Sequence, residues 1–258
     1  MSDLVTYETR NRCAVITLNR ADKRNALSRN LISALHQAVD RAAGDDSARA
    51  VILTGAGNVF CAGMDLTEVQ ESMAPTSGTS PVWEDARTLS RLYDRLYTLP
   101  RPTIAAVNGS AVAGGAGLVS VCDLALCVPE AKFGYPEVRR GLVAAMVMPH
   151  LMRHVGERMA RYLLLTGELI SAEEALAAGF VNRIVPAAEL LNRAFEWGAS
   201  LAAGGPMALA RTKELLQLFS RQALGVEEAA NASAAPRLTD ECRQGLEAFF
   251  AKKQPPWA

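Results

Sequence analysis

Short apolar runs alternate with amphipathic stretches along the first half of the chain. Runs rich in Val and Ile predict four β-strands: Cys13–Leu18, Ala48–Thr54, Thr103–Val107 and Leu124–Val128. Between the first two strands, apolar positions recur at helical spacing, with Ser28 as N-cap and Gly44 as a C-terminal stop. Strands that alternate with helices in this way predict an α/β fold.

From about residue 156 the pattern becomes mostly helical. Ser171 and Glu174 form a capping box at the start of a short helix, and Phe180–Val185 predicts a brief strand. Two further helices are predicted from Pro206 to about Ala223 and over Thr239–Lys253. We therefore expect an α/β core over residues 1–200 and a helical subdomain over residues 201–258.

Composition excludes several classes of function. The 258 residues include 27 basic and 27 acidic side chains, so no basic excess points to a nucleic-acid partner. The longest apolar runs are well below the roughly 18–20 residues of a membrane span, so no membrane partner is expected. The N-terminus lacks a secretory signal and the five cysteines form no CxxC pair, which predicts a cytoplasmic location with reduced thiols.

No metal site is expected. His150 and His154 have a spacing that zinc ligands can adopt, but no third ligand lies nearby in the sequence, so core or surface roles are favoured. Cys61 adjoins a glycine turn without an evident basic partner, which disfavours a catalytic thiol.

Two glycine-centred segments carry the first chemical signal. Cys61–Leu66 and Asn108–Leu118 each follow an apolar run and precede a helix-like stretch, so each presents unpaired backbone N–H groups. Two such groups that converge from separate segments polarise a carbonyl and hold the oxyanion that develops on it. Glu137 follows Pro136 and could move a proton α to that carbonyl, although its spacing alone is more typical of a solvated loop residue.

Together these segments resemble the enoyl-CoA hydratase/isomerase (crotonase) superfamily, from about residue 5 to the end of the chain. The motifs that carry the resemblance are Leu18–Leu27, Phe60–Leu66, Asn108–Gly117, Phe133–Glu137 and Phe249–Lys253. The resemblance implies a crotonase-like spiral of ββα units with a C-terminal helical trimerisation region. It also implies a homotrimer or a hexamer, an acyl-CoA thioester as substrate, and no cofactor besides the coenzyme A of that substrate.

The resemblance also assigns roles to individual residues. The backbone N–H groups of Met64 and Gly114 would hold the thioester oxygen, and Glu137 would exchange the proton at the α-carbon. The residues that match the coenzyme A or substrate surface are Lys23, Arg24, Ala26, Leu27, Ala62, Asp65, Leu66, Phe249 and Lys252. The stretch Met73–Pro81 is expected to form a loop that could wall the site.

One position departs from the family. Hydratases of this family carry a further glutamate where this chain has Gly117, and Asp123 is the nearest carboxylate along the chain. Three functions remain open. They are a hydratase that uses Glu137 alone or recruits Glu68, Glu84 or Asp85, a double-bond isomerase that needs Glu137 alone, and an acyl-CoA-binding protein without catalysis.

Overall fold

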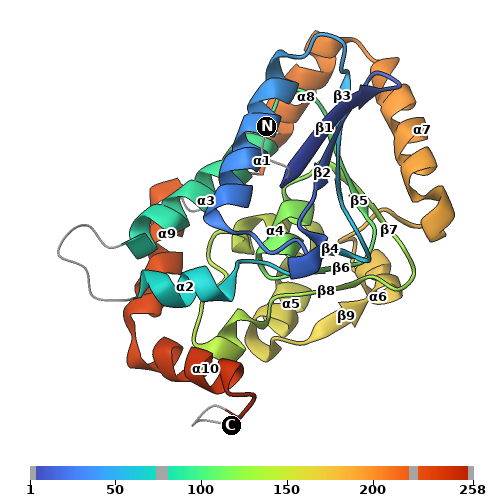
Figure 1. Ribbon diagram of the computed structural model, residues 1–258. Helices are drawn as coiled ribbons and strands as arrows, with labels where there is room; N and C mark the ends of the chain where they lie inside the picture. The colour runs from blue at the N-terminus through green and yellow to red at the C-terminus, as the bar shows by residue number, and fades with distance from the viewer. Residues whose placement is uncertain (1–3, 74–80, 221–225, 255–258) are drawn as a thin grey trace.

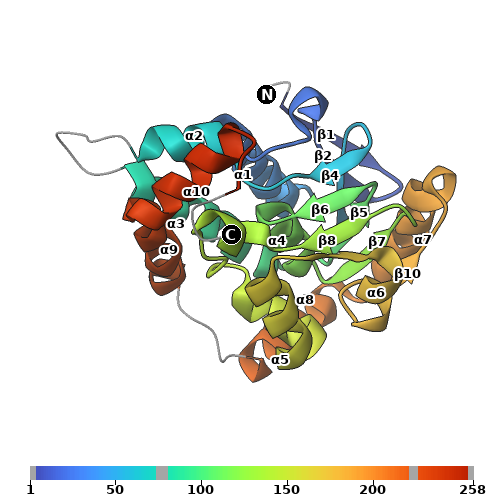
Figure 2. The same ribbon diagram turned by 90° about the horizontal axis from the view of Figure 1, so that it is seen from below.

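Two β-sheets form the centre of the molecule in the computed structural model, which describes residues 4–73, 81–220 and 226–254 (Figures 1 and 2). The larger sheet has the order β1 (Val5–Arg10), β2 (Cys13–Leu18), β3 (Ala50–Gly55), β5 (Thr103–Val107), β7 (Leu124–Cys127) and β10 (Arg183–Ile184). The smaller has the order β4 (Val59–Cys61), β6 (Ser110–Val112), β8 (Lys132–Gly134) and β9 (Leu169–Ser171).

The chain passes from one sheet to the other in a repeating spiral. Strands β3, β5 and β7 of the larger sheet are followed at once by β4, β6 and β8 of the smaller. Helices lead back to the larger sheet after β4 and β6, whereas α5 leads from β8 to β9 of the smaller sheet. The pairs β3–β5, β5–β7, β4–β6 and β6–β8 are all parallel, as crossover connections require. The spiral of ββα units expected from the resemblance is confirmed.

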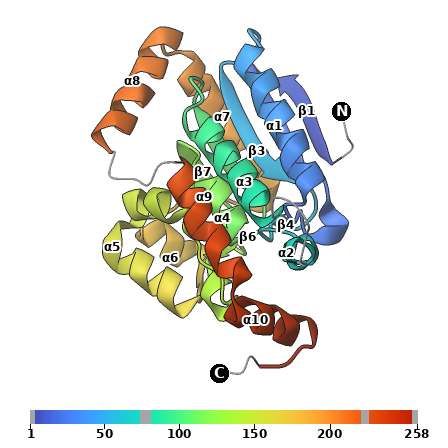
Figure 3. The same cartoon turned by 90° about the vertical axis from the view of Figure 1, so that its left-hand side faces the viewer.

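Helices cover both faces of the larger sheet. Figures 1 and 3 show α1 and α3 side by side on one face and α7 on the other. The helices of the core are α1 (Arg29–Gly44), α2 (Leu66–Ser72), α3 (Pro81–Tyr97), α4 (Gly114–Ser120), α5 (Met148–Thr166), α6 (Ala172–Ala177) and α7 (Leu190–Ala202). Those that follow are α8 (Pro206–Phe219), α9 (Val226–Ala234) and α10 (Asp240–Phe250). Short 3-10 helices are η1 (Ala21–Lys23), η2 (Pro136–Arg140), η3 (Ala187–Glu189) and η4 (Ala235–Leu238).

The C-terminal helices return to the core. Helix α9 packs along α3, and α10 packs against η2. Each described element after α7 is helical, which supports a helical subdomain; the boundary near residue 200 stays a prediction. Among the described residues, no helix is long and apolar enough to cross a membrane.

The predicted strands and caps are largely confirmed. Strands β2 and β5 have the expected bounds, and β3 and β7 differ by one or two residues. The Ser28 hydroxyl accepts from the backbone N–H of Leu31, and the capping box at Ser171 is present. Strand β1 was not predicted, because it is mostly solvent-exposed and carries few apolar positions. Helix α3 was not predicted either, although its buried residues recur at helical spacing.

Some predicted bounds were wrong. The strand expected over Phe180–Val185 contracts to β10, because the Phe180 N–H turns back to the Ala175 carbonyl, 2.8 Å away, instead of joining a sheet. Helix α8 ends at Phe219, and α10 ends at Phe250 rather than at Lys253. Of the expected loop Met73–Pro81, residues 74–80 lie outside the described residues.

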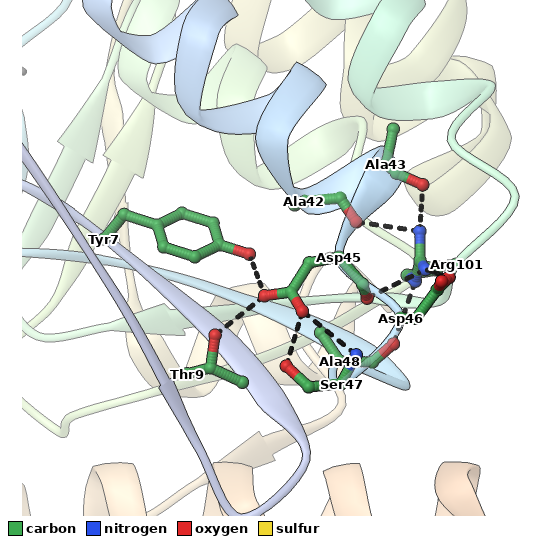
Figure 4. Close-up of polar contacts among 9 residues, drawn as sticks. All are labelled: Tyr7, Thr9, Ala42, Ala43, Asp45, Asp46, Ser47, Ala48 and Arg101. Carbon is green, nitrogen blue, oxygen red and sulfur yellow. Dashed lines mark hydrogen bonds and ion pairs between the residues drawn. The ribbon is translucent and has the colours of Figure 1, made fainter.

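The C-terminal end of α1 is fastened by a polar cluster around Asp45 (Figure 4). The hydroxyls of Tyr7 and Thr9 donate to the Asp45 carboxylate at 2.7 and 2.8 Å, which ties α1 to β1. Arg101 donates to backbone carbonyls of the same turn, including that of Ala42 at 2.8 Å. With 16 residues, α1 runs about 24 Å from this anchor back to Leu27 and Ser28 at the site described next.

Candidate active site

The two glycine segments lie against each other in space. A β-carbon added to Gly63 would lie 2.8 Å from the Ala113 β-carbon and 3.2 Å from the Gly114 nitrogen. Gly63 also has a φ of +90°, which disfavours any residue with a side chain. Glycine at this position therefore permits the close approach of the two segments that the sequence suggested.

Each segment presents a free backbone donor. The Leu27 N–H donates to the Gly63 carbonyl at 2.8 Å, and the Asp65 N–H donates to the Leu27 carbonyl at 3.1 Å. This bridge leaves the intervening Met64 N–H without an acceptor among the described residues. Gly114 is the first residue of α4, so its N–H has no partner within the helix.

Strain and a buried phenol hold the second donor in place. Ala113 precedes α4 at φ 53° and ψ −125°, a conformation that costs an alanine about 1–3 kcal/mol. Beneath it, the Tyr93 hydroxyl donates to the Gly114 carbonyl at 2.8 Å, and Tyr93 is 2 % exposed. Backbone strain of this kind persists only where the surroundings impose it, as expected at a binding site.

Glu137 is not the solvated loop residue that its spacing alone favoured. It lies in η2, its side-chain oxygen Oε2 is buried, and this oxygen has no hydrogen-bond partner among the described residues. Burial raises the pKa of Glu137 to about 7, an effect that the nearby Arg140 guanidinium partly opposes. A carboxyl group with such a pKa both accepts and returns a proton near neutral pH.

These groups share a cavity of about 810 Å³, a size typical of small-molecule sites. Glu137, Met64 and Gly114 all line it. Seven residues expected to contact coenzyme A or substrate also line it, namely Lys23, Arg24, Ala26, Ala62, Asp65, Leu66 and Phe249. The cavity thus brings together ten of the twelve predicted site residues.

Leu27 and Lys252 do not line this cavity. The Leu27 side chain is 1 % exposed in the core, and its backbone pairs with the Met64 segment, so it supports the donor rather than contacting a ligand. Lys252 is exposed beyond the end of α10. Asp65 lines the cavity but is also engaged, because Arg20 donates to its carboxylate at 2.7 Å.

Comparison with protein families matches residues 8–258 to the enoyl-CoA hydratase/isomerase family. This chain belongs to that family. A relative from Thermus thermophilus, named "Putative enoyl-CoA hydratase", is 44 % identical over 94 % of this chain and 96 % of its own. The short-chain-enoyl-CoA hydratase of Clostridium acetobutylicum is 32 % identical over 97 % of this chain and 95 % of its own.

A solved structure extends the same result. The crystal structure of an enoyl-CoA hydratase from Mycobacterium avium superposes with a TM-score of 0.86 at 31 % identity, and covers the whole of both chains. The family and these names make the chain an enzyme of the hydratase type that acts on acyl-CoA, and favour this reading over an isomerase or a silent binding protein.

The space beside Gly117, where this family's hydratases carry a further glutamate, is already filled. A β-carbon on residue 117 would overlap Cγ1 of Val147 and would lie 2.8 Å from the Tyr93 hydroxyl oxygen. Tyr93 and Val147 both line the cavity. The absent carboxylate is thus replaced by a packed wall with one phenol in it.

We predict that Gly117→Ala destabilises the protein by about 1–3 kcal/mol, since the new methyl group overpacks against Val147 and Tyr93. Val147→Ala in the same chain is expected to recover part of that loss, because it relieves the closest contact and leaves the one with Tyr93, and urea unfolding of the two single variants and the double variant measures it. Additive losses in the double variant would contradict the packed wall. Gly44→Ala is the control, because a β-carbon there meets nothing within 4 Å.

The other acids and nucleophiles suggested by the sequence lie elsewhere. Glu68 accepts from the Arg29 N–H at 2.7 Å, Asp85 pairs with the Arg29 guanidinium, and Glu84 pairs with Arg87; none of the three lines the cavity. The alternative in which the enzyme recruits one of these three carboxylates was therefore wrong. Burial raises the pKa of Cys61 to about 12, which removes it as a nucleophile at neutral pH.

No metal-binding group of His, Cys, Asp or Glu occurs within residues 4–73, 81–220 and 226–254. Of the two candidate histidines, His154 bonds the Ser120 carbonyl at 2.9 Å and His150 bonds Arg153 at 3.1 Å. Sequence reasoning missed Tyr93 altogether. Its spacing with Leu89, Leu92 and Leu96 on one helical face was the signal that could have placed it in the core.

Proposed function

We propose that this enzyme hydrates the α,β double bond of an acyl-CoA thioester, with Glu137 as its single acid and base. One observation carries the proposal: Glu137, whose Oε2 is buried without a hydrogen-bond partner among the described residues, lines the same cavity as Met64 and Gly114, the two residues with free backbone N–H groups. Two backbone donors on the thioester oxygen stabilise the enolate that forms when a nucleophile attacks the β-carbon.

The proposed reaction needs two proton transfers by one group. The Glu137 carboxylate removes a proton from water as the water oxygen bonds to the β-carbon and the double-bond electrons move onto the thioester oxygen. The enolate then collapses, and the protonated Glu137 returns a proton to the α-carbon. In total, one water is added, one hydroxyacyl thioester is formed, and Glu137 is again a carboxylate.

Tyr93 is proposed to position the water. Its proton is committed to the Gly114 carbonyl, so its oxygen still accepts a hydrogen bond at the wall beside Gly117. The charge of Glu137 influences the pKa of Tyr93, which places the two groups near each other. Tyr93 would thus supply the orienting contact that the missing glutamate supplies in other hydratases.

We expect Tyr93→Phe to lower hydration more than double-bond isomerisation, by about tenfold in the ratio of the two rates. Loss of the hydrogen bond to Gly114 loosens the oxyanion donor in both reactions, whereas loss of the water contact affects hydration alone. The assay follows the enoyl absorbance with each type of substrate. Tyr97→Phe is the matched control, because Tyr97 lies one helical turn further along α3 and does not line the cavity. Equal losses in both reactions would leave Tyr93 with a structural role alone.

Isomerisation is the second candidate, and the filled space beside Gly117 favours it. Moving a double bond between the β,γ and α,β positions needs one base that shuttles one proton, and Glu137 is sufficient for it. A phenol in place of the second carboxylate is compatible with this simpler reaction.

The deciding experiment uses two substrates. Purified protein is mixed with crotonyl-CoA, where loss of the conjugated-enoyl absorbance reports hydration, and separately with a 3-enoyl-CoA, where a gain reports isomerisation. Hydration of crotonyl-CoA is the expected result. Isomerisation without hydration would overturn the proposal in favour of the second candidate.

Three finer features stay proposals: the contacts with coenzyme A, the homotrimer or hexamer, and the cytoplasmic location. The exposed basic side chains of Lys23 and Arg24 at the cavity support phosphate binding. Strongly exposed apolar side chains on α8, such as Met207 at 85 % and Leu216 at 64 %, support subunit contacts there. Light scattering of the purified protein in solution would give its subunit number.

A further inference from the structure

Arg237 is a buried arginine that takes no part in the mechanism above. It lies in η4, between α9 and α10, and is 2 % exposed. It lines the same cavity as the proposed oxyanion donors, together with Met64, Val69 and Ser233. Long charged side chains are almost never buried to this degree without a partner of opposite charge.

The guanidinium of Arg237 has no such partner among the described residues. Its Nη2 donates only to the thioether sulfur of Met64, at 3.2 Å, and a thioether is a weak acceptor. Its Nη1 is buried and has no hydrogen-bond partner. The acid that most affects its pKa is Asp85, but both oxygens of that carboxylate are held at 2.8 Å by Arg29.

Arg140 provides a contrast in the same cavity. Its Nε is also buried without a partner, but its charge is met by the neighbouring Glu137, and its guanidinium stacks 4.5 Å from the centre of the Phe249 ring. For Arg237, no such ring contact occurs among the described residues, and Asp85, the acid that acts on it, is already paired with Arg29. An arginine stays protonated in proteins, so burying this charge without a partner is unfavourable.

A ligand in the cavity can supply the missing anion. Arg237 also borders a smaller cavity of about 380 Å³, in which Arg243 already pairs with Asp240 and Glu247. The Met64 side chain that Arg237 contacts lines the main cavity and not the smaller one. In the main cavity, Nη2 touches the end of the side chain whose backbone N–H is proposed to hold the thioester oxygen. The anion therefore lies about one methionine side chain from the thioester carbonyl.

We propose that Arg237 binds a carboxylate at the far end of a short acyl chain, so that the preferred substrates are CoA monothioesters of short unsaturated dicarboxylic acids. This inference rests on the proposed function for the position of the thioester. A planar carboxylate matches the two terminal nitrogens of a guanidinium. Because Nη1 is buried, the flexible Met64 side chain at Nη2 would move aside for the carboxylate to reach both nitrogens. Val69 and Met64 would pack against the carbon chain between the two ends.

The test compares two saturated thioesters of equal length, glutaryl-CoA and pentanoyl-CoA, by calorimetry with the full-length protein. We expect the wild type to bind glutaryl-CoA at least about tenfold more tightly, as a hydrogen bond to a buried charge implies. Arg237→Met is expected to abolish or invert this preference. Arg161→Met is the matched control, since Arg161 is exposed on α5 and pairs with Glu157.

Three outcomes overturn the inference. The wild type binds both thioesters equally, the Arg237→Met variant keeps the preference, or that variant weakens both thioesters and free coenzyme A alike. The last outcome would assign Arg237 to a coenzyme A phosphate instead. The binding of the two thioesters to the wild type tests the inference without any variant. Arg237→Gln serves as the second variant if Arg237→Met does not fold.

Turnover separates this inference from the proposed function. Glutaconyl-CoA and trans-2-pentenoyl-CoA are offered to the wild type under the same conditions. Hydration of neither, with the binding preference for glutaryl-CoA intact, would overturn the proposed function but not the carboxylate site. Hydration of both at equal efficiency, without a binding preference, would overturn the carboxylate site alone.

Discussion

Glu137→Gln is expected to lower turnover by at least about a thousandfold and to leave binding of butyryl-CoA within about tenfold of the wild type. Glutamine keeps the size of the side chain but cannot accept and return a proton. The cavity and the backbone donors at Met64 and Gly114 stay as they are, so ground-state binding persists. The rate of change of the enoyl absorbance measures turnover, and calorimetry measures the affinity for butyryl-CoA.

Glu168→Gln is the control for this prediction. Glu168 is a second glutamate at the rim of the same cavity, but it is exposed and accepts a hydrogen bond from the Tyr162 hydroxyl. Its replacement is expected to change turnover less than about twofold. Full activity of the Glu137 variant would remove Glu137 from the mechanism.

The raised pKa of Glu137 gives this prediction a pH dependence. The base must be ionised, so kcat/KM of the wild type for hydration should rise as pH increases through about 7. The free energy of unfolding should instead fall as pH increases. The pKa of Glu137 is about 7 in the folded protein against the ordinary value of 4.5, so the folded state favours the neutral acid, and this contribution is lost as pH rises from about 4.5 through 7.

The Glu137→Gln variant should therefore be more stable than the wild type at pH 8, by up to about 3 kcal/mol, and nearly equal below about pH 4. Thermal unfolding at the two pH values measures this. A variant less stable than the wild type at pH 8 would contradict the buried, unpartnered carboxyl.

Gly114→Val is expected to lower kcat/KM by at least about a hundredfold, the effect of losing one oxyanion donor. A β-carbon at this position would lie 3.0 Å from the Tyr93 hydroxyl and 3.2 Å from Cδ1 of Leu27. The added branches leave no room unless the backbone moves, and this movement turns the Gly114 N–H away from the thioester oxygen.

Because ground-state and transition-state contacts both use this donor, binding of butyryl-CoA should weaken together with turnover. Gly44→Val is the control, because a β-carbon on Gly44 meets nothing within 4 Å. Circular dichroism of both variants checks the fold. A Gly114→Val enzyme with unchanged kcat/KM would remove Gly114 from the oxyanion site.

Local sequence determined much of the fold. Strand β5 and the caps at Ser28 and Ser171 follow from apolar runs and hydrogen-bonding side chains that act within a few residues. Strand β1 was not predicted, because Val5 is its one fully buried residue and the strand has almost no apolar pattern. Its place in the sheet comes from pairing with β2 and from its tie to Asp45.

The sequence by itself also predicted the parts of the candidate site. The glycine segments around positions 63 and 114 indicated backbone donors, whereas Glu137 entered through the resemblance to the family, because its spacing alone favoured a solvated loop residue. Tertiary structure alone decided three matters: that Tyr93 and Val147 fill the space beside Gly117, that Oε2 of Glu137 is buried, and that Arg237 lines the cavity without a counterion among the described residues. Burial and charge pairing depend on neighbours far apart in the chain, so no local pattern encodes them.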